Sequence, residues 1–186
     1  MFFMKYQLSP EQLAFAQLHA EKMSAGASTR SFKSGTRQNT EVYFIGKIGE
    51  LAVYNFLKGK NFDVVHIPFR DSYEKFNWND DFQIKLGDRI RQIEVRTKAR
   101  NVAQVRDDFK VCSDVIKPAL DYIFVNYSRA DNTATILGWA DWRNWQAHGK
   151  EVLAGTKNEN FVHKVNEFEL EVRHLFSMAE YRLGFW

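Results

Sequence analysis

The sequence contains one cysteine, Cys112, among its 186 residues. A single thiol excludes an internal disulfide and a zinc cluster built from cysteines, and we interpret Cys112 as a small buried hydrophobic residue. Stability must therefore come from the interior. With 45% hydrophobic and 15% aromatic residues, the chain can bury enough apolar surface to fold unaided. Its length favours a single domain that spans residues 1–186.

Long apolar runs are also missing. No stretch approaches the roughly 18 residues of a membrane-spanning helix. The first residues, MFFMKYQLSPEQ, do not contain the apolar region of a secretion signal. We therefore expect no membrane partner and a cytoplasmic location.

Several motifs with known chemistry are absent as well. No Walker loop or G-x-G-x-x-G follows a predicted strand, so we expect no nucleotide cofactor. The histidines are dispersed and show no spacing typical of metal ligands. Trp142 and Trp145 could stack on bases, but their spacing of three on a short predicted helix favours packing.

The charge of the chain is mildly basic, at a net +3, and this value alone indicates no partner. The distribution is more informative, because basic residues gather between Lys85 and Lys110. Such a stretch is more often a solvated face than a binding surface. It needs support from other features of the sequence.

The hydrophobic pattern predicts an α/β fold with a mixed sheet. A helix over 9–24 begins with a capping box formed by Ser9 and Gln12, and a mobile basic loop follows over 24–40. The remaining predicted elements are a helix over 41–58 that stops at Gly59, strands at 62–67, 82–86, 93–95, 122–127 and 134–139, a short helix capped by Asp141, and a C-terminal helix opened by Ser177. The core of the domain is expected at about 41–140, and a helical and strand region at 141–186.

The two strands after residue 81 predict a hairpin with Gly87 and Asp88 as its turn. In this register Phe82 faces Ile93, and Asp81 faces Glu94. Two carboxylates placed so are destabilising, because their Cβ atoms lie only about 4.5–5.5 Å apart. A divalent cation would compensate, and Arg96 and Lys98 share the same face. An exposed hairpin with a merely solvated charged face is the competing interpretation.

The predicted helix at 41–58 carries Gly46, Gly49, Glu50 and Val53 on one side. A glycine within a helix costs about 1 kcal/mol relative to alanine, so the pair indicates close packing on that side. Glu50 would share the packed side. Without the glycines it would be interpreted as an ordinary surface carboxylate.

Together these segments resemble the PD-(D/E)XK nuclease superfamily, which has the restriction-endonuclease-like fold. The resemblance covers about residues 41–100 and rests on Gly46-Lys-Ile-Gly49-Glu50, Asp81-Phe-Gln-Ile and Ile93-Glu94-Val-Arg-Thr-Lys98, in that order. It implies a restriction-endonuclease-like core in which helices flank a mixed central β-sheet.

The resemblance also implies a site. Asp81 and Glu94 would be metal ligands together with the Val95 carbonyl, and Glu50 would be an outer or direct metal contact. The metal would be Mg²⁺, with Mn²⁺ as a substitute. One position departs from the family, because Arg96 stands where lysine is usual. Arginine cannot act as a general base. It can hold a phosphate while Lys98 takes the role of the lysine, or the site is inactive.

The expected function is a Mg²⁺-dependent endonuclease that hydrolyses DNA, of the restriction, repair or phage type. Its DNA backbone contacts would come from basic residues outside the metal site, namely Arg30, Lys33, Arg37, Arg100 and Arg106. A homodimer would supply two sites for cutting both strands. The alternatives are a catalytically inactive nucleic-acid-binding domain that keeps this fold, and an interaction or structural module whose acidic pair is surface decoration.

Overall fold

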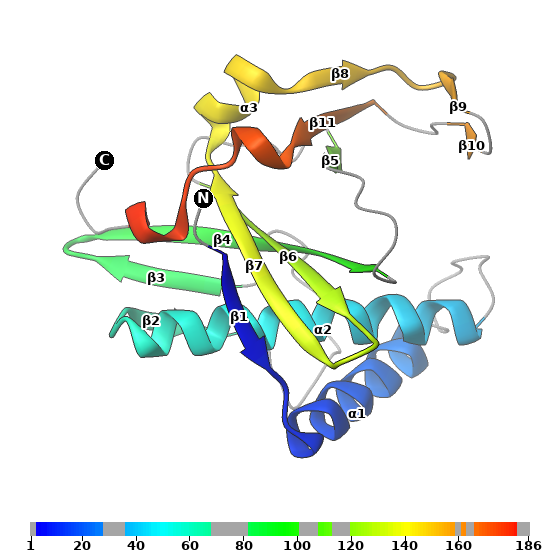
Figure 1. Cartoon of the computed structure of the whole chain (residues 1–186), viewed down its shortest axis with the longest axis vertical. Coiled ribbons are helices and arrows are strands. Elements are labelled where there is room, and N and C mark those ends of the chain that lie inside the picture. Colours follow the sequence, from blue (N-terminus) through cyan, green and yellow to red (C-terminus); the bar gives the residue numbers. More distant parts are fainter. Residues whose placement is uncertain are drawn as a thin grey trace.

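A computed structural model describes the protein over residues 3–27, 36–67, 82–100, 108–112, 120–158, 161–162 and 166–181. A six-stranded mixed sheet runs through the molecule in the order β1-β7-β6-β4-β3-β2 (Figure 1). Its strands are β1 (Met4–Gln7), β2 (Asp63–His66), β3 (Phe82–Leu86), β4 (Arg89–Arg100), β6 (Leu120–Ser128) and β7 (Thr133–Ala140). Only β4 and β6 are parallel, and the other neighbours in this sheet are antiparallel.

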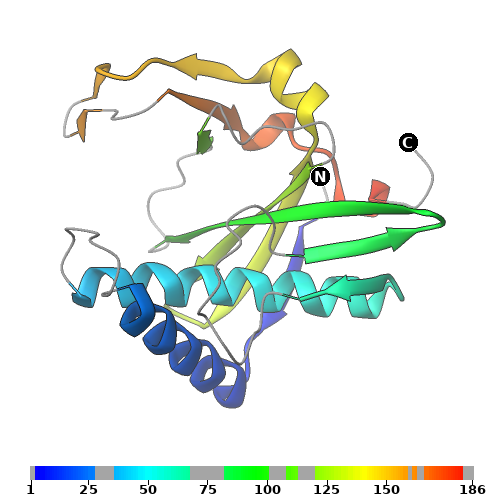
Figure 2. The same ribbon diagram turned by 180° about the vertical axis from the view of Figure 1, so that it is seen from behind.

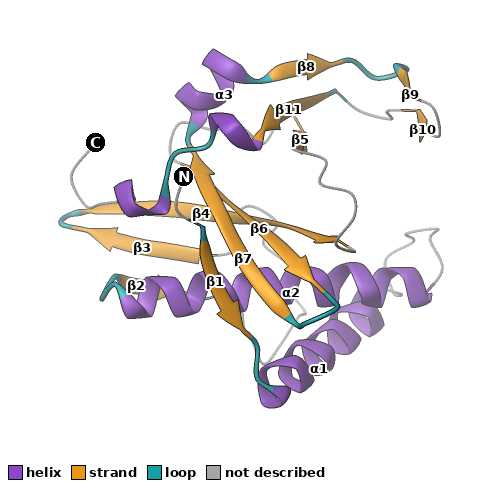
Figure 3. Ribbon diagram, viewed as in Figure 1, coloured by secondary structure: helices purple, strands orange, loops and turns teal. Residues whose placement is uncertain are grey.

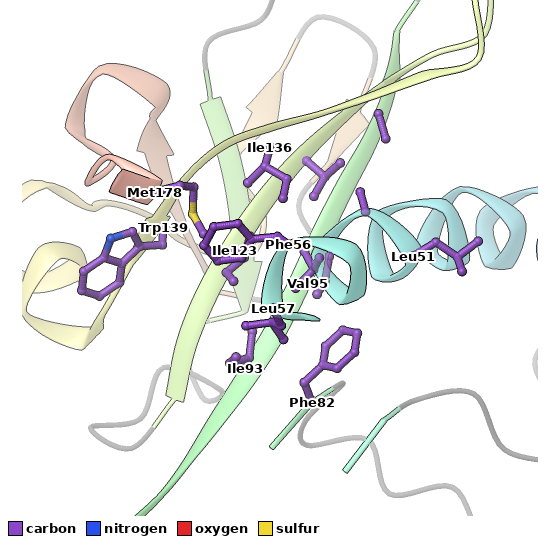
Figure 4. Close-up of a cluster of buried hydrophobic side chains, with 14 of the residues drawn as sticks. Leu51, Phe56, Leu57, Phe82, Ile93, Val95, Ile123, Ile136, Trp139 and Met178 are labelled. Atoms are coloured by element: carbon purple, nitrogen blue, oxygen red, sulfur yellow. The ribbon is translucent and has the colours of Figure 1, made fainter. Parts of the chain in front are cut away.

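Two helices cover one face of this sheet, α1 (Pro10–Ala27) and α2 (Thr36–Gly59). Helix α2 packs on β4, β6 and β7. In Figure 4, Phe56 and Leu57 of α2 lie against apolar side chains of the three strands. Those side chains are almost fully shielded from solvent and include Ile93, Val95, Ile123 and Ile136.

A second layer covers the opposite face (Figure 2). It contains α3 (Trp142–His148) and a three-stranded sheet of β5 (Asp108–Cys112), β11 (Glu167–Glu171) and β8 (Lys150–Val152). Trp145 of α3 packs on Tyr122 and Phe124 of β6, with ring centroids 5.6 and 6.1 Å away. The central sheet is therefore buried on both faces at β6 and at the end of β7, and Figure 3 shows the two layers by element type.

The remaining elements are short. They are the strands β9 (Lys157–Asn158) and β10 (Phe161–Val162) and the 3₁₀ turns η2 (Val172–His174) and η3 (Met178–Glu180). Among the described residues, no helix combines the length and apolar character needed to cross a membrane.

The local predictions are confirmed where backbone chemistry fixes them. Ser9 and Gln12 form the capping box, since each backbone N–H donates to the other's side chain, at 3.0 and 3.3 Å. The hairpin has the predicted register, with Phe82 opposite Ile93 and Leu86 opposite Arg89. Asp141 caps α3 by accepting from the Asn144 backbone at 3.0 Å.

The predicted loop over 24–40 is wrong at both ends, because α1 continues to Ala27 and α2 begins at Thr36. Alanines favour the extension of α1, and packing of α1 on α2 buries Ser24. Extension of α2 adds one backbone hydrogen bond per residue, and no glycine or proline interrupts 36–40. Residues 28–35 lie outside the described part.

The C-terminal helix is also corrected. Ser177 accepts from the Ala179 backbone at 3.3 Å, but it caps the single 3₁₀ turn η3. Residues 182–186 lie outside the described part. Strands β1, β5 and β8 to β11 were not predicted individually, and β8, β9 and β10, with two or three residues each, are too short to show a period.

One of the two helix glycines makes the close contact that the sequence indicates. A Cβ atom on Gly49 would lie 1.8 Å from Oγ1 and 2.9 Å from Cβ of Thr97, so α2 and β4 approach each other closely here. The same expectation for Gly46 is wrong, since a Cβ there would meet nothing within 4 Å. Glu50 and Val53 are buried, as predicted for this side of the helix.

These two glycines form a matched pair for mutation. Gly49→Ala should lower the free energy of unfolding by about 1–3 kcal/mol, because the added methyl overlaps Thr97. Gly46→Ala should raise it by up to about 1 kcal/mol, because alanine favours a helix and has room here. Urea unfolding of both variants measures the difference. Equal effects at the two positions would contradict the close approach of α2 and β4.

A buried polar cluster fastens the C-terminal segment to the sheet. Arg91 of β4 forms an ion pair with Asp121 of β6, and the Tyr181 hydroxyl donates to the same carboxylate at 3.1 Å. Asp121 is 1% exposed. Burial raises the pKa of this carboxyl above its usual value, although the hydrogen bonds from Arg91 and Tyr181 act in the opposite direction. The cluster joins two strands of the sheet to the segment that follows η3.

The hydroxyl of Tyr181 should therefore contribute measurably to stability. Tyr181→Phe removes a buried hydrogen bond to a carboxylate and should lower the free energy of unfolding by about 1–2 kcal/mol. Tyr6→Phe is the matched control, because the half-buried Tyr6 hydroxyl forms no hydrogen bond with any described residue. Chemical denaturation of both variants gives the comparison, and equal losses would rule out a specific role for the Tyr181 hydroxyl.

Candidate active site

Strand β4 carries the central part of the candidate site. Ile93 and Val95 point toward α2 and are buried in the core on that side. Side chains alternate along a strand, so Glu94, Arg96 and Lys98 lie on the opposite face of β4. The parallel register places them beside Tyr122, Phe124 and Asn126 of β6, respectively. The shared face of Glu94, Arg96 and Lys98 is thus confirmed.

The hairpin pairing ends where the motif begins. The last described pair of β3 and β4 is Phe82 with Ile93. From Glu94 onward, β6 is the only strand neighbour of β4 within the described residues. Asp81, the predicted partner of Glu94, lies outside the described part, so the opposed carboxylates stay a prediction.

Glu94 and Arg96 form an ion pair. Nη2 of Arg96 lies 3.0 Å from Oε1 of Glu94, and the two side chains are 37% and 14% exposed. Nε of Arg96 is buried and has no hydrogen-bond partner among the described residues. The Arg96 guanidinium thus neutralises Glu94 through one nitrogen, while its Nε donor stays unused within the described part of the chain.

Glu50 lies on α2, on the helix side of the sheet. Its side chain is buried and forms an ion pair with Lys47, one turn earlier in α2. The neighbouring Gly49 packs on Thr97, so α2 lies against the face of β4 that carries Ile93 and Val95, and Glu94 points to the other face. Glu50 is therefore not an ordinary surface carboxylate. Lys47 was missed by the sequence analysis, although its spacing of three from Glu50 is a recognisable signal for a helical ion pair.

Asn126 is a polar residue of this face that the sequence analysis also missed. It lies opposite Lys98 in the parallel ladder, and its Oδ1 atom is buried with no hydrogen-bond partner in the described part of the chain. Arg96 and Asn126 therefore carry an unused donor and an unused acceptor on one face of adjacent strands. Water or a ligand usually satisfies such atoms. No local pattern identifies Asn126, because its position depends on the register between strands distant in sequence.

The predicted DNA contacts are not placed by the structure. Arg30, Lys33 and Arg106 lie outside the described residues, and Arg37 and Arg100 are described for the backbone alone. The side chain of Cys112 is likewise not described. The packing interpretation is confirmed for Trp145, which is 1% exposed and is therefore not available to stack on bases.

Two of the histidines that are dispersed in the sequence come together in the structure. The rings of His148 and His174 stack at 4.4 Å with an angle of 13° between their planes. Arg173 donates to Nε2 of His174 at 3.3 Å. The stacking of the two rings packs the end of α3 against η2.

Among the described residues, no three His, Cys, Asp or Glu side chains come together in a group that could hold a metal ion. Asp81 lies outside the described residues. No family model matches the chain, and neither a curated protein nor a solved structure matches it.

Proposed function

We propose that the protein is a metal-dependent nuclease that hydrolyses DNA and has a restriction-endonuclease-like core. One observation carries the proposal: Glu94 and Arg96 project together from a central strand at the point where its described pairing with β3 ends. A mixed sheet supports it, with a hairpin that leads into this strand and a helix that packs on the strand's other face.

The residues of the site suit a hard divalent cation. Glu94 offers a carboxylate that is largely shielded from solvent and already attracts a cationic group. Magnesium prefers carboxylate and carbonyl oxygens and keeps several waters. Asp81, Glu94 and the Val95 carbonyl would hold Mg²⁺ or its substitute Mn²⁺, and Glu50 would support the metal. Bound there, the ion would supply an activated water and stabilise charge on the scissile phosphate.

The basic residues of the face would act on the phosphate. Arg96 stays protonated, so it would donate hydrogen bonds to phosphate oxygens and not abstract a proton. Lys98, two residues further on the same face, would neutralise charge in place of the usual lysine. The substrate would be cut internally, as by an endonuclease of the restriction, repair or phage type. A homodimer would present one such site to each strand.

Loss of one metal ligand tests this function directly. Plasmid cleavage in Mg²⁺ or Mn²⁺ should fall by about a hundredfold or more in Asp81→Asn and in Glu94→Gln, since each removes a ligand charge. Glu151→Gln is the control, because Glu151 is an exposed glutamate on β8 of the other layer. Circular dichroism confirms that each variant is folded. Undiminished cleavage by both ligand variants would exclude the proposed site.

A catalytically inactive nucleic-acid-binding domain is the second candidate. The ion pair between Arg96 and Glu94 favours it, because the arginine occupies the carboxylate that a metal would need. Such a domain would bind DNA in the presence of a chelator and would not cut it with any added metal ion. A gel shift in EDTA, run beside the cleavage assay, separates the two candidates.

Both candidates predict DNA binding that weakens with salt. Each phosphate contact releases counterions, so the logarithm of affinity should fall against the logarithm of salt with a slope of about 0.9 per contact. The Arg30, Lys33, Arg37 triple alanine variant should flatten this slope by up to about 2.7. A triple alanine variant of the exposed residues Lys150, Lys157 and Arg173 is matched in charge. If both variants keep the wild-type slope, residues 30–37 do not contact the backbone.

A further inference from the structure

The ion pair between Arg96 and Glu94 has an uneven geometry. The two side chains stand two residues apart on one face of β4, so the long arginine turns toward its neighbour along the strand. One nitrogen, Nη2, contacts the carboxylate at 3.0 Å. Nε is buried and finds no acceptor among the residues that the structure describes. A guanidinium can bind a carboxylate through two parallel hydrogen bonds, one from Nη2 and one from Nε. Glu94 receives only the one from Nη2 of this pair.

An unpaired buried donor is unfavourable, so this position of the guanidinium is incompletely satisfied. Its attraction to Glu94 is electrostatic, and a divalent cation exerts a stronger attraction on the same carboxylate. Two cations cannot share one carboxylate without mutual repulsion. The position of Arg96 and the binding of a metal at Glu94 must therefore be coupled.

We propose that Arg96 is a built-in competitor for the metal. In the metal-free protein its guanidinium occupies Glu94, and it leaves when a divalent cation is bound there. The released guanidinium presents Nη2 and Nε together to a phosphate oxygen pair, so metal binding and nucleic-acid binding strengthen each other. This inference rests on the proposed function, because it takes Glu94 to be a metal ligand.

The competition has a measurable direction. Removing the arginine charge removes one cation that competes for Glu94, so Arg96→Gln should bind a divalent cation more tightly than the wild type does. The pair is partly exposed, with side chains 37% and 14% exposed, so solvent screens it. We expect an increase in affinity of about threefold to tenfold. Arg96→Lys keeps the positive charge, so its affinity for the cation should lie between those of the wild type and Arg96→Gln.

Isothermal titration of the full chain with Mn²⁺ alone measures this effect without any cleavage. The control variant is Lys85→Gln, which removes an exposed positive charge from the neighbouring strand β3. The expected result is tighter Mn²⁺ binding in Arg96→Gln, wild-type affinity in Lys85→Gln, and no binding in Glu94→Gln. Arg96→Lys keeps the test valid if Arg96→Gln does not fold.

The outcomes separate the inference from the proposed function. If Mn²⁺ binds the wild type, is lost in Glu94→Gln and binds Arg96→Gln no more tightly, the competition is wrong and the metal site stands. If Mn²⁺ binds neither the wild type nor Arg96→Gln, both fail. Binding by Arg96→Gln but not by the wild type supports the competition and favours the inactive domain.

A second measurement tests the released guanidinium. Fluorescence anisotropy of a short DNA duplex is recorded in Ca²⁺ and in EDTA, because Ca²⁺ takes the same oxygen ligands. Calcium should raise the affinity of the wild type for DNA by a larger factor than that of Arg96→Gln, since binding effects are reciprocal. Equal factors would show that Arg96 does not pass from Glu94 to the phosphate.

Discussion

The close approach of helix α2 to strand β4 is the contact on which the rest of the structure depends. Gly49 allows the helix backbone to lie against Thr97, where any side chain would overlap. This contact directs Ile93 and Val95 into the core beneath the helix. Because side chains alternate along a strand, the same contact turns Glu94 and Arg96 to the other face. The core and the candidate site are thus two consequences of one packing arrangement.

That arrangement also explains why charged residues can occupy the middle of a sheet. Buried charges are unfavourable unless they are paired, and each of the buried carboxylates near β4 has a cationic partner. Glu50 pairs with Lys47 from its own helix, and Asp121 pairs with Arg91 from the neighbouring strand. Glu94 pairs with Arg96 on its own strand. Of these pairs, the one of Glu94 has the more exposed cation, so its exchange for another cation requires the least disruption.

The sequence predicts the features that short-range chemistry determines. A two-residue turn fixes the hairpin register, and hydroxyl or carboxylate caps fix the starts of α1 and α3. It does not predict Asn126 or the Asp121 cluster, because the parallel register of β4 and β6 depends on a long connection and not on a turn. Glu94, Arg96 and Lys98 were found because strand alternation alone places them on one face. The carboxylate of Asp81 lies outside the described residues, so its place opposite Glu94 stays a prediction.

The two candidate functions differ in one physical step. A nuclease and an inactive binding domain would both show Arg96 on Glu94 when no metal is present, because a shielded carboxylate attracts the nearest cation. They differ in whether the guanidinium leaves. Departure becomes more favourable when phosphate is present, since Nε gains the acceptor that it lacks in the free protein. Substrate would then promote formation of the metal site, which couples catalysis to the presence of DNA. A lysine in place of Arg96 has no Nε donor to leave unpaired, so it would not provide this coupling.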